Sequence, residues 1–348
     1  MGENTKVLIV DDSAVVRMSL TNQLSKHQGI EVVGSAPDPY VAREMILKHK
    51  PDVITLDLEM PRMDGLTFLR KLMAAKPIPT IVISSLTPKG CETALACIEA
   101  GAVHVLAKPS AAYSVGDLTD ELARLIHGAK HIKLDRRKPV SASKPITTAM
   151  IETTNKIVAV GSSTGGTDAL TRLLTPLPPT APGIVIVQHM PAGFTKSFAD
   201  RLDTLCQLEV TEAQDGDSVV PGRALLAPGE RHMKLLRDGA RYIVRVYDGE
   251  RVCRHRPSVH VLFESVAKHA GANAMGVMLT GMGDDGAEAM KSMHDAGAFN
   301  VAQNKESCVV FGMPHAAIEA GGVDEVLHLD SIPQRIADFA SAKFKRAA

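Results

Sequence analysis

Three segments carry the side-chain types that nucleophilic catalysis requires, and the first places a serine between small residues. Residues 161–166 read Gly-Ser-Ser-Thr-Gly-Gly, a G-x-S-x-G pattern centred on Ser163. In this pattern a sharp turn between a strand and a helix can present a serine hydroxyl, because the small neighbours avoid steric conflict. A helix-capping turn explains the same residues, whereas a phosphate-binding loop would need a Gly-Lys-Ser/Thr ending that is absent here.

A serine nucleophile needs a base, and the second segment supplies a histidine. His189 belongs to Gln-His-Met-Pro at 188–191, directly after an apolar run. There it could accept the Ser163 proton and return it to the leaving group. His255 and His260 compete for this role, since sequence position alone does not separate a catalytic histidine from a structural one.

The third segment, residues 280–286, supplies carboxylates within a glycine-rich stretch. Either Asp284 or Asp285 could orient the imidazole of the base. The resulting chain order is serine, histidine, acid, whereas α/β-hydrolases run serine, acid, histidine. The residues therefore predict triad chemistry on a different fold.

The N-terminal part holds a second constellation, in which polar side chains follow four apolar runs. These side chains are Asp11 and Asp12, then Asp57, Ser84 and Lys108. The carboxyl ends of parallel strands meet at one sheet edge, and carboxylates gathered there repel one another unless a cation is bound. A hard divalent ion such as Mg2+ suits them, and Asp57 could then attack a phosphoryl group while Lys108 neutralises charge. Helix capping would explain any one of these aspartates alone.

The elements that must position these groups alternate between strands and helices in the first part of the chain. Short runs rich in β-branched residues are typical of buried parallel strands, and Ser13 can cap the first helix. The pattern predicts a doubly wound, flavodoxin-like sheet of five parallel strands for a domain at 1–128. The predicted strands are 6–10, 31–35, 53–58, 80–84 and 103–107.

A charged stretch interrupted by proline and rich in serine and threonine predicts a linker at 129–153. Its basic run could be a nucleic-acid tail, but a solvated linker suits the neutral chain better. The same alternation then restarts and predicts a second, mostly parallel doubly wound α/β domain at 154–348. Asp238-Gly239 adds an antiparallel hairpin. The predicted strands are 156–160, 184–188, 233–236, 242–246 and 274–279.

The amino-acid composition limits the classes of protein to which this chain can belong. The chain has 348 residues, 45% of them hydrophobic, which suits two folded domains. Thirty-nine basic residues balance thirty-nine acidic ones, so the formal net charge is zero. The chain therefore has no overall electrostatic field that would attract nucleic acid or an anionic membrane. The five cysteines form no C-x-x-C pair and predict reduced thiols. Because neither a bilayer-spanning apolar run nor a signal-peptide pattern is present, we expect a cytoplasmic protein.

Residues 5–128 resemble a response-regulator receiver domain. The resemblance rests on Asp11-Asp12, on Asp57 within the segment 57–65, on Ser84 and on Lys108-Pro109. It implies that a histidine kinase phosphorylates Asp57, and that Ser84 bonds the phosphoryl group and shifts the switch with Lys108.

The same resemblance implies a Mg2+ site made by Asp12, Asp57 and the backbone carbonyl of Glu59, with Asp11 beside them. One position departs from the family pattern. Val105 stands where many receivers carry an aromatic switch residue.

Together with the receiver, the whole chain resembles the chemotaxis response-regulator protein-glutamate methylesterase family. The supporting motifs are 161–166, 188–191, 255–259 and 279–286. The resemblance implies Ser163 as nucleophile, His189 as general base and acid, and Asp285 as the orienting carboxylate. It also implies that the Met282 N–H lies at the oxyanion position and that Thr164 and His255 line the site, while Asp284 has no catalytic role.

The implied reaction is hydrolysis of glutamate γ-methyl esters on chemoreceptors, with deamidation of glutamine by the same route. This step needs no cofactor, and Mg2+ serves the receiver alone. The implied partners are the receptors and a kinase at cytoplasmic receptor arrays, with the receiver inhibiting the esterase until Asp57 is phosphorylated. Two alternatives stay open. A DNA-binding regulator is disfavoured by the neutral charge and the strand-rich second half, and a noncatalytic adaptor by the intact Ser163, His189 and Asp285.

Overall fold

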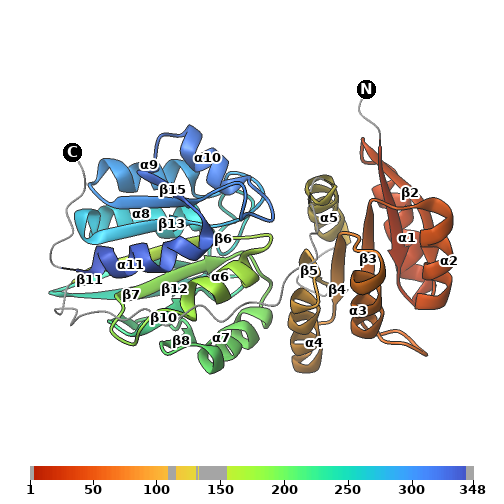
Figure 1. The fold of residues 1–348 in the computed structure, drawn as a ribbon, viewed down its shortest axis with the longest axis horizontal. Coiled ribbons are helices and arrows are strands. Elements are labelled where there is room, and N and C mark those ends of the chain that lie inside the picture. The colour runs from red at the N-terminus through yellow and green to blue at the C-terminus, as the bar shows by residue number, and fades with distance from the viewer. Residues whose placement is uncertain (1–3, 109–114, 131, 133–154, 342–348) are drawn as a thin grey trace. The chain divides into compact units, whose positions relative to one another are not determined.

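The computed structural model describes residues 4–108, 115–130, 132 and 155–341 (Figure 1). The chain divides between positions 137 and 138 into two compact units. Each unit is described by itself. Most of the predicted linker, together with Pro109, lies outside the described residues.

The first unit is a parallel sheet of five strands in the order β2-β1-β3-β4-β5, which confirms the predicted fold. Helices α1 and α5 contact each other, as do α3 and α4. The side chain of Ser13 caps α1 by accepting a hydrogen bond from the Val16 N–H at 3.5 Å, as predicted. The elements are β1 (Thr5–Val10), α1 (Ala14–Leu24), β2 (Ile30–Ala36), α2 (Pro39–His49), β3 (Val53–Asp57), α3 (Gly65–Ala75), β4 (Thr80–Ser84), α4 (Pro88–Glu99), β5 (His104–Ala107) and α5 (Val115–Ala129).

The second unit is built on a seven-stranded parallel sheet in the order β15-β14-β13-β6-β7-β10-β8. Helix α6 contacts α7 and α11, while α8 contacts α9, and α9 contacts α10 (Figure 1). The main elements are β6 (Ile157–Ser162), α6 (Gly166–Leu174), β7 (Gly183–Gln188), α7 (Phe194–Leu205), β8 (Glu209–Glu212), β10 (Arg223–Leu226), α8 (Val259–His269), β13 (Ala274–Met278), α9 (Ala287–Asp295), β14 (Phe299–Gln303), α10 (Met313–Glu319), β15 (Glu325–Leu327) and α11 (Ile332–Ala340).

A separate antiparallel sheet contains the predicted hairpin. Strands β11 (His232–Asp238) and β12 (Arg241–Tyr247) pair with Asp238 opposite Arg241, and β9 (Ser218–Val219) joins their edge. Gly239 in the turn has φ +59°, a conformation that glycine adopts at little cost. Apolar residues of the hairpin and of α8 belong to one buried core. Helix α8 therefore packs against β11 of the hairpin as well as against α9.

The order of the central strands explains how distant segments meet. Strand β6 lies between β13 and β7, with Gly161 paired to Met278 and Ser162 to Gln188. All three strands run parallel, so the segments that leave their carboxyl ends start side by side. No helix among the described residues is long and apolar enough to span a membrane.

Candidate active site

Ser163 occupies the turn between β6 and α6 and is buried. Its N–H donates to the Thr280 carbonyl at 3.1 Å, and its own carbonyl accepts from the Gln188 side-chain amide at 3.0 Å. Gly165 closes the turn with φ +80°, and a Cβ there would lie 2.6 Å from Val309. The turn therefore requires glycine for both its backbone angle and its packing.

Gln188, the last residue of β7, joins the serine turn to the histidine. Its amide nitrogen donates to the carbonyls of Ser163 and His189, each at 3.0 Å, and its oxygen accepts from Ser162 Oγ at 2.7 Å. Sequence reasoning assigned Gln188 no role. Its only signal was its place in the histidine motif at the end of a buried strand.

His189 and Asp285 form a buried pair. His189 Nε2 lies 2.8 Å from Asp285 Oδ2, and both side chains are almost fully removed from solvent. Nδ1 of His189 is buried and has no hydrogen-bond partner among the described residues. With Nε2 facing the carboxylate, a neutral ring carries its free lone pair on Nδ1. The structure thus leaves one nitrogen of His189 open for a substrate or nucleophile.

The competing residues lie differently. His255 stacks on His189 with ring centroids 3.8 Å apart and planes 9° from parallel. His260 contributes its main-chain N–H to Asp285 at 3.0 Å. Asp284 is exposed and pairs with Arg254 at 3.0 Å. Of the two neighbouring aspartates, the structure brings Asp285 to His189.

Asp285 accepts three further hydrogen bonds, two on Oδ1 and one more on Oδ2. Their donors are Ser258 Oγ at 2.8 Å, the Val259 N–H at 2.7 Å and the His260 N–H at 3.0 Å. Burial acts to raise the pKa of Asp285, but the bond from His189 and those from Ser258 and His260 outweigh it and hold the pKa well below its usual range. Asp285 is therefore an ionised carboxylate at neutral pH.

Met282 and Thr164 were predicted as oxyanion and lining residues, and each has a polar group without a described partner. The Met282 N–H has no acceptor among the described residues. The neighbouring Gly281 approaches Ser163 so closely that a Cβ on it would lie 2.9 Å from Ser163 Cβ. Thr164 is buried, and its hydroxyl also has no partner within the described part of the chain.

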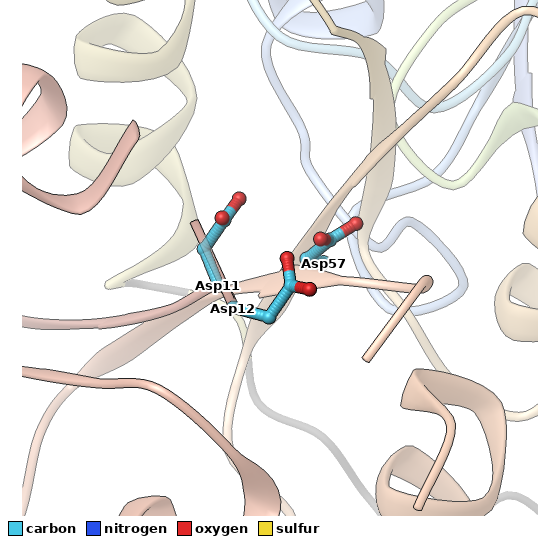
Figure 2. A group of neighbouring side chains, drawn as sticks. All are labelled: Asp11, Asp12 and Asp57. Atoms are coloured by element: carbon cyan, nitrogen blue, oxygen red, sulfur yellow. The ribbon is translucent and has the colours of Figure 1, made fainter. Parts of the chain in front are cut away.

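A second site lies at the edge of the first unit. Figure 2 shows Asp11 and Asp12, which follow β1, with their carboxylates beside that of Asp57 at the end of β3. One oxygen from each carboxylate can be chosen so that all three lie within 4.8 Å of one another. Burial, together with the charge of Asp57, raises the pKa of Asp11 to about 6. Crowded acidic oxygens of this kind fit a hard divalent cation, which relieves their repulsion.

Lys108 and Glu59 complete this edge. Lys108 Nζ donates to Asp57 Oδ2 at 2.7 Å, yet burial raises the pKa of Asp57 despite that bond. The Glu59 N–H donates to Asp57 Oδ1 at 3.2 Å, and the Glu59 side chain accepts from Ser85 at 2.8 Å.

Ser84, which was also predicted to act in the switch, makes no hydrogen bond to Asp57 in the described part of the chain. The Ser84 hydroxyl is buried and lies 3.3 Å from the Gly90 carbonyl in the first turn of α4, at hydrogen-bonding distance. Val105 is buried in β5.

Two families of known proteins match parts of this chain. The profile of the CheB methylesterase family matches residues 158–336, and that of the response regulator receiver domain matches residues 7–118. The chain belongs to the CheB methylesterase family. This confirms the resemblance that the motifs predicted.

Relatives of this CheB-family chain align over almost its whole length. A protein-glutamate methylesterase/protein-glutamine glutaminase of Syntrophus aciditrophicus is 55% identical, with 95% of this chain and 98% of the relative covered. The protein of that name from Salmonella typhimurium is 50% identical, with 95% of each chain covered. The CheB methylesterase catalytic domain of Thermotoga maritima is 40% identical, with a TM-score of 0.52 over 53% of this chain and 97% of that structure.

Proposed function

We propose that this chain hydrolyses glutamate γ-methyl esters of chemoreceptors and deamidates receptor glutamines, in chemotactic adaptation or a related chemosensory pathway. Family membership and the names of the relatives support the activity. The observation that carries the site is the buried His189–Asp285 pair, which leaves Nδ1 without a described partner on a residue whose N–H donates to the Ser162 carbonyl at 3.1 Å.

In the proposed mechanism, Ser163 Oγ attacks the ester carbonyl while His189 Nδ1 accepts its proton. The ionised Asp285 stabilises the imidazolium and keeps the ring oriented. The Met282 N–H donates to the developing oxyanion, and Thr164 and His255 line the site.

His189 then gives its proton to the leaving methoxide, methanol departs, and an acyl-enzyme remains. Water attacks this intermediate and His189 takes up a proton from it. His189 then returns that proton to Ser163 Oγ as the acyl bond breaks, so the glutamate is released and Ser163 is restored. A glutamine follows the same path with ammonia as the leaving group. No cofactor enters these steps.

In the proposed regulation, a histidine kinase supplies the phosphoryl group to Asp57. Mg2+ held by Asp11, Asp12, Asp57 and the Glu59 carbonyl would neutralise charge on the phosphoryl oxygens. Lys108 would add a positive charge beside the phosphoryl group on Asp57. Ser84 would turn from the Gly90 carbonyl toward the new phosphoryl group. Val105 occupies the position at which many receivers carry an aromatic switch residue.

In the proposed domain organisation, residues 1–128 form the receiver, residues 129–153 the linker and residues 154–348 the esterase domain. The receiver inhibits the esterase until Asp57 is phosphorylated. Phosphorylation adds about two negative charges, enough to alter a docking face. We place the protein in the cytoplasm at receptor arrays, with no nucleic-acid partner.

Methanol release from a methylated receptor fragment tests the activity. The wild type should release methanol and leave glutamate, and Ser163→Ala should release none while keeping its fold. Ser197→Ala removes a hydroxyl from the exposed face of α7 and serves as the matched control. Methanol release by Ser163→Ala at the wild-type rate would exclude the proposed nucleophile.

A further inference from the structure

Helix α8 begins without a capping side chain of its own. Ser258 occupies the N-cap position, but its hydroxyl accepts no hydrogen bond from the first turn. The N–H groups of Val259 and His260 donate to Asp285 instead. A serine at this position usually accepts from the second or third N–H of the helix. Here the carboxylate of a distant loop has that function.

Ser258 acts as a donor in this arrangement. Its hydroxyl is fully buried and donates to Asp285 Oδ1 at 2.8 Å. With His189 on Oδ2, each carboxylate oxygen receives two hydrogen bonds. A carboxylate offers about four acceptor sites, so these bonds match its usual capacity. Rotation of this group would break bonds to α8 and to His189 together.

Close packing keeps the first turn of α8 against the site. A Cβ on Gly161 or on Gly286 would lie 2.4 Å from Val259 Cγ1. Gly161 belongs to β6, two residues before Ser163, and Gly286 follows Asp285. The absence of side chains at both glycines lets α8 contact the strand that carries the serine and the loop that carries the acid.

We propose that Ser258 is a positioning residue for the reaction, which together with the first turn of α8 fixes Asp285 so that His189 presents Nδ1 to Ser163. The inference rests on the proposed function. Helix capping alone does not account for Ser258, because Asp285 already satisfies the first turn and Ser258 adds a bond to the carboxylate. Since Ser258 contacts neither Ser163 nor His189 by hydrogen bond, its effect passes through Asp285.

The test compares Ser258→Ala with Ser265→Ala in the full-length chain, with a methylated receptor fragment as substrate and the same phosphodonor throughout. Ser265 lies on the same helix, and its hydroxyl makes two hydrogen bonds away from the site: it accepts from the Leu235 N–H and donates to the Leu262 carbonyl. Ser258→Ala should lower kcat about tenfold with KM unchanged, the size expected for losing one bond to an ionised group. Ser258→Thr, which keeps the donor, should restore most of kcat. Ser265→Ala should keep the wild-type kcat.

A spectroscopic measurement separates this inference from the proposed activity. The 15N shifts of the His189 ring should show Nε2 protonated and Nδ1 bare in the wild type, and a mixture of tautomers in Ser258→Ala. If the wild type releases no methanol, the proposed function fails and the ring shifts still decide the role of Ser258. A wild-type ring pattern in a folded Ser258→Ala, or an equal fall in kcat for Ser265→Ala, would overturn the inference.

Discussion

His189 Nε2 lies 2.8 Å from Asp285 Oδ2, although 96 positions separate the two residues in the chain. Strand β6 places the serine turn between the segments that carry these two side chains. The bond occupies one ring nitrogen and leaves the other without a described partner. The distinction between Asp285 and its neighbour Asp284 follows directly, since Asp284 faces solvent and Arg254.

Asp285→Asn should lower kcat at least about a hundredfold, because an amide can hold the imidazole in the wrong tautomer. Asp284→Asn removes only an exposed ion pair and should change kcat by less than about threefold. Initial rates of methanol release for both variants on one receptor fragment provide the comparison. A larger loss of kcat for Asp284→Asn would show that Asp284, and not Asp285, orients the imidazole.

Acid should weaken the second unit through Asp285. Because its pKa is lowered on folding, the ionised carboxylate stabilises the folded state fully above its ordinary pKa of 3.8, and this contribution is lost as the pH falls toward the folded-state value. The wild-type Tm should therefore fall more steeply than that of Asp285→Asn between about pH 5 and about pH 3. Calorimetry at each pH measures this, with Asp284→Asn as the control that keeps the wild-type slope. Parallel slopes for wild type and Asp285→Asn would contradict the lowered pKa.

Asp57→Ala should abolish incorporation of a phosphoryl group and leave methanol release unresponsive to phosphodonor, because the proposed acceptor is gone. Ser84→Ala should still incorporate the phosphoryl group, since its hydroxyl bonds the Gly90 carbonyl rather than Asp57. Its activation should nevertheless be weakened. Radiolabelled phosphodonor and methanol release report the two steps separately. Full activation of Ser84→Ala would remove Ser84 from the switch.

Removal of residues 1 to about 150 should raise the basal rate of methanol release. A tenfold rise corresponds to only about 1.4 kcal/mol of inhibitory docking. The truncated chain and the unphosphorylated full chain are compared at equal concentration, with circular dichroism as a check on folding. If the truncated chain is folded and no faster, the receiver does not inhibit, and delivery of the enzyme to its receptor becomes the better account of its role.

Much of the fold was predictable because its buried strands are continuous β-branched runs. Residues 80–84 were predicted as they are observed in β4, and Asp238-Gly239 correctly located the hairpin. Strand β14 was missed because Asn300 and Gln303 interrupt its apolar pattern. Both are buried, and the Asn300 amide is satisfied by the carbonyls of Met290 and Gly322. A sequence window does not contain such distant partners.

The site shows the same limit. Ser163, His189 and Asp285 stand in short motifs whose residue types suggest their chemistry. Gln188 stands in the motif of His189, and Ser258 stands in the separate motif at 255–259. Their place in the site depends on hydrogen bonds to other segments, which only the folded chain reveals.

Covalent labelling tests the central claim, that Ser163 is the nucleophile of a glutamyl methylesterase. A fluorophosphonate forms a phosphorus–oxygen bond with an activated serine and releases fluoride. After digestion, mass spectrometry should find one adduct, on Ser163, and a methylated receptor fragment should slow its formation more than the demethylated fragment does. An adduct on Ser162 or elsewhere, or labelling that the methylated fragment does not slow, would contradict the account.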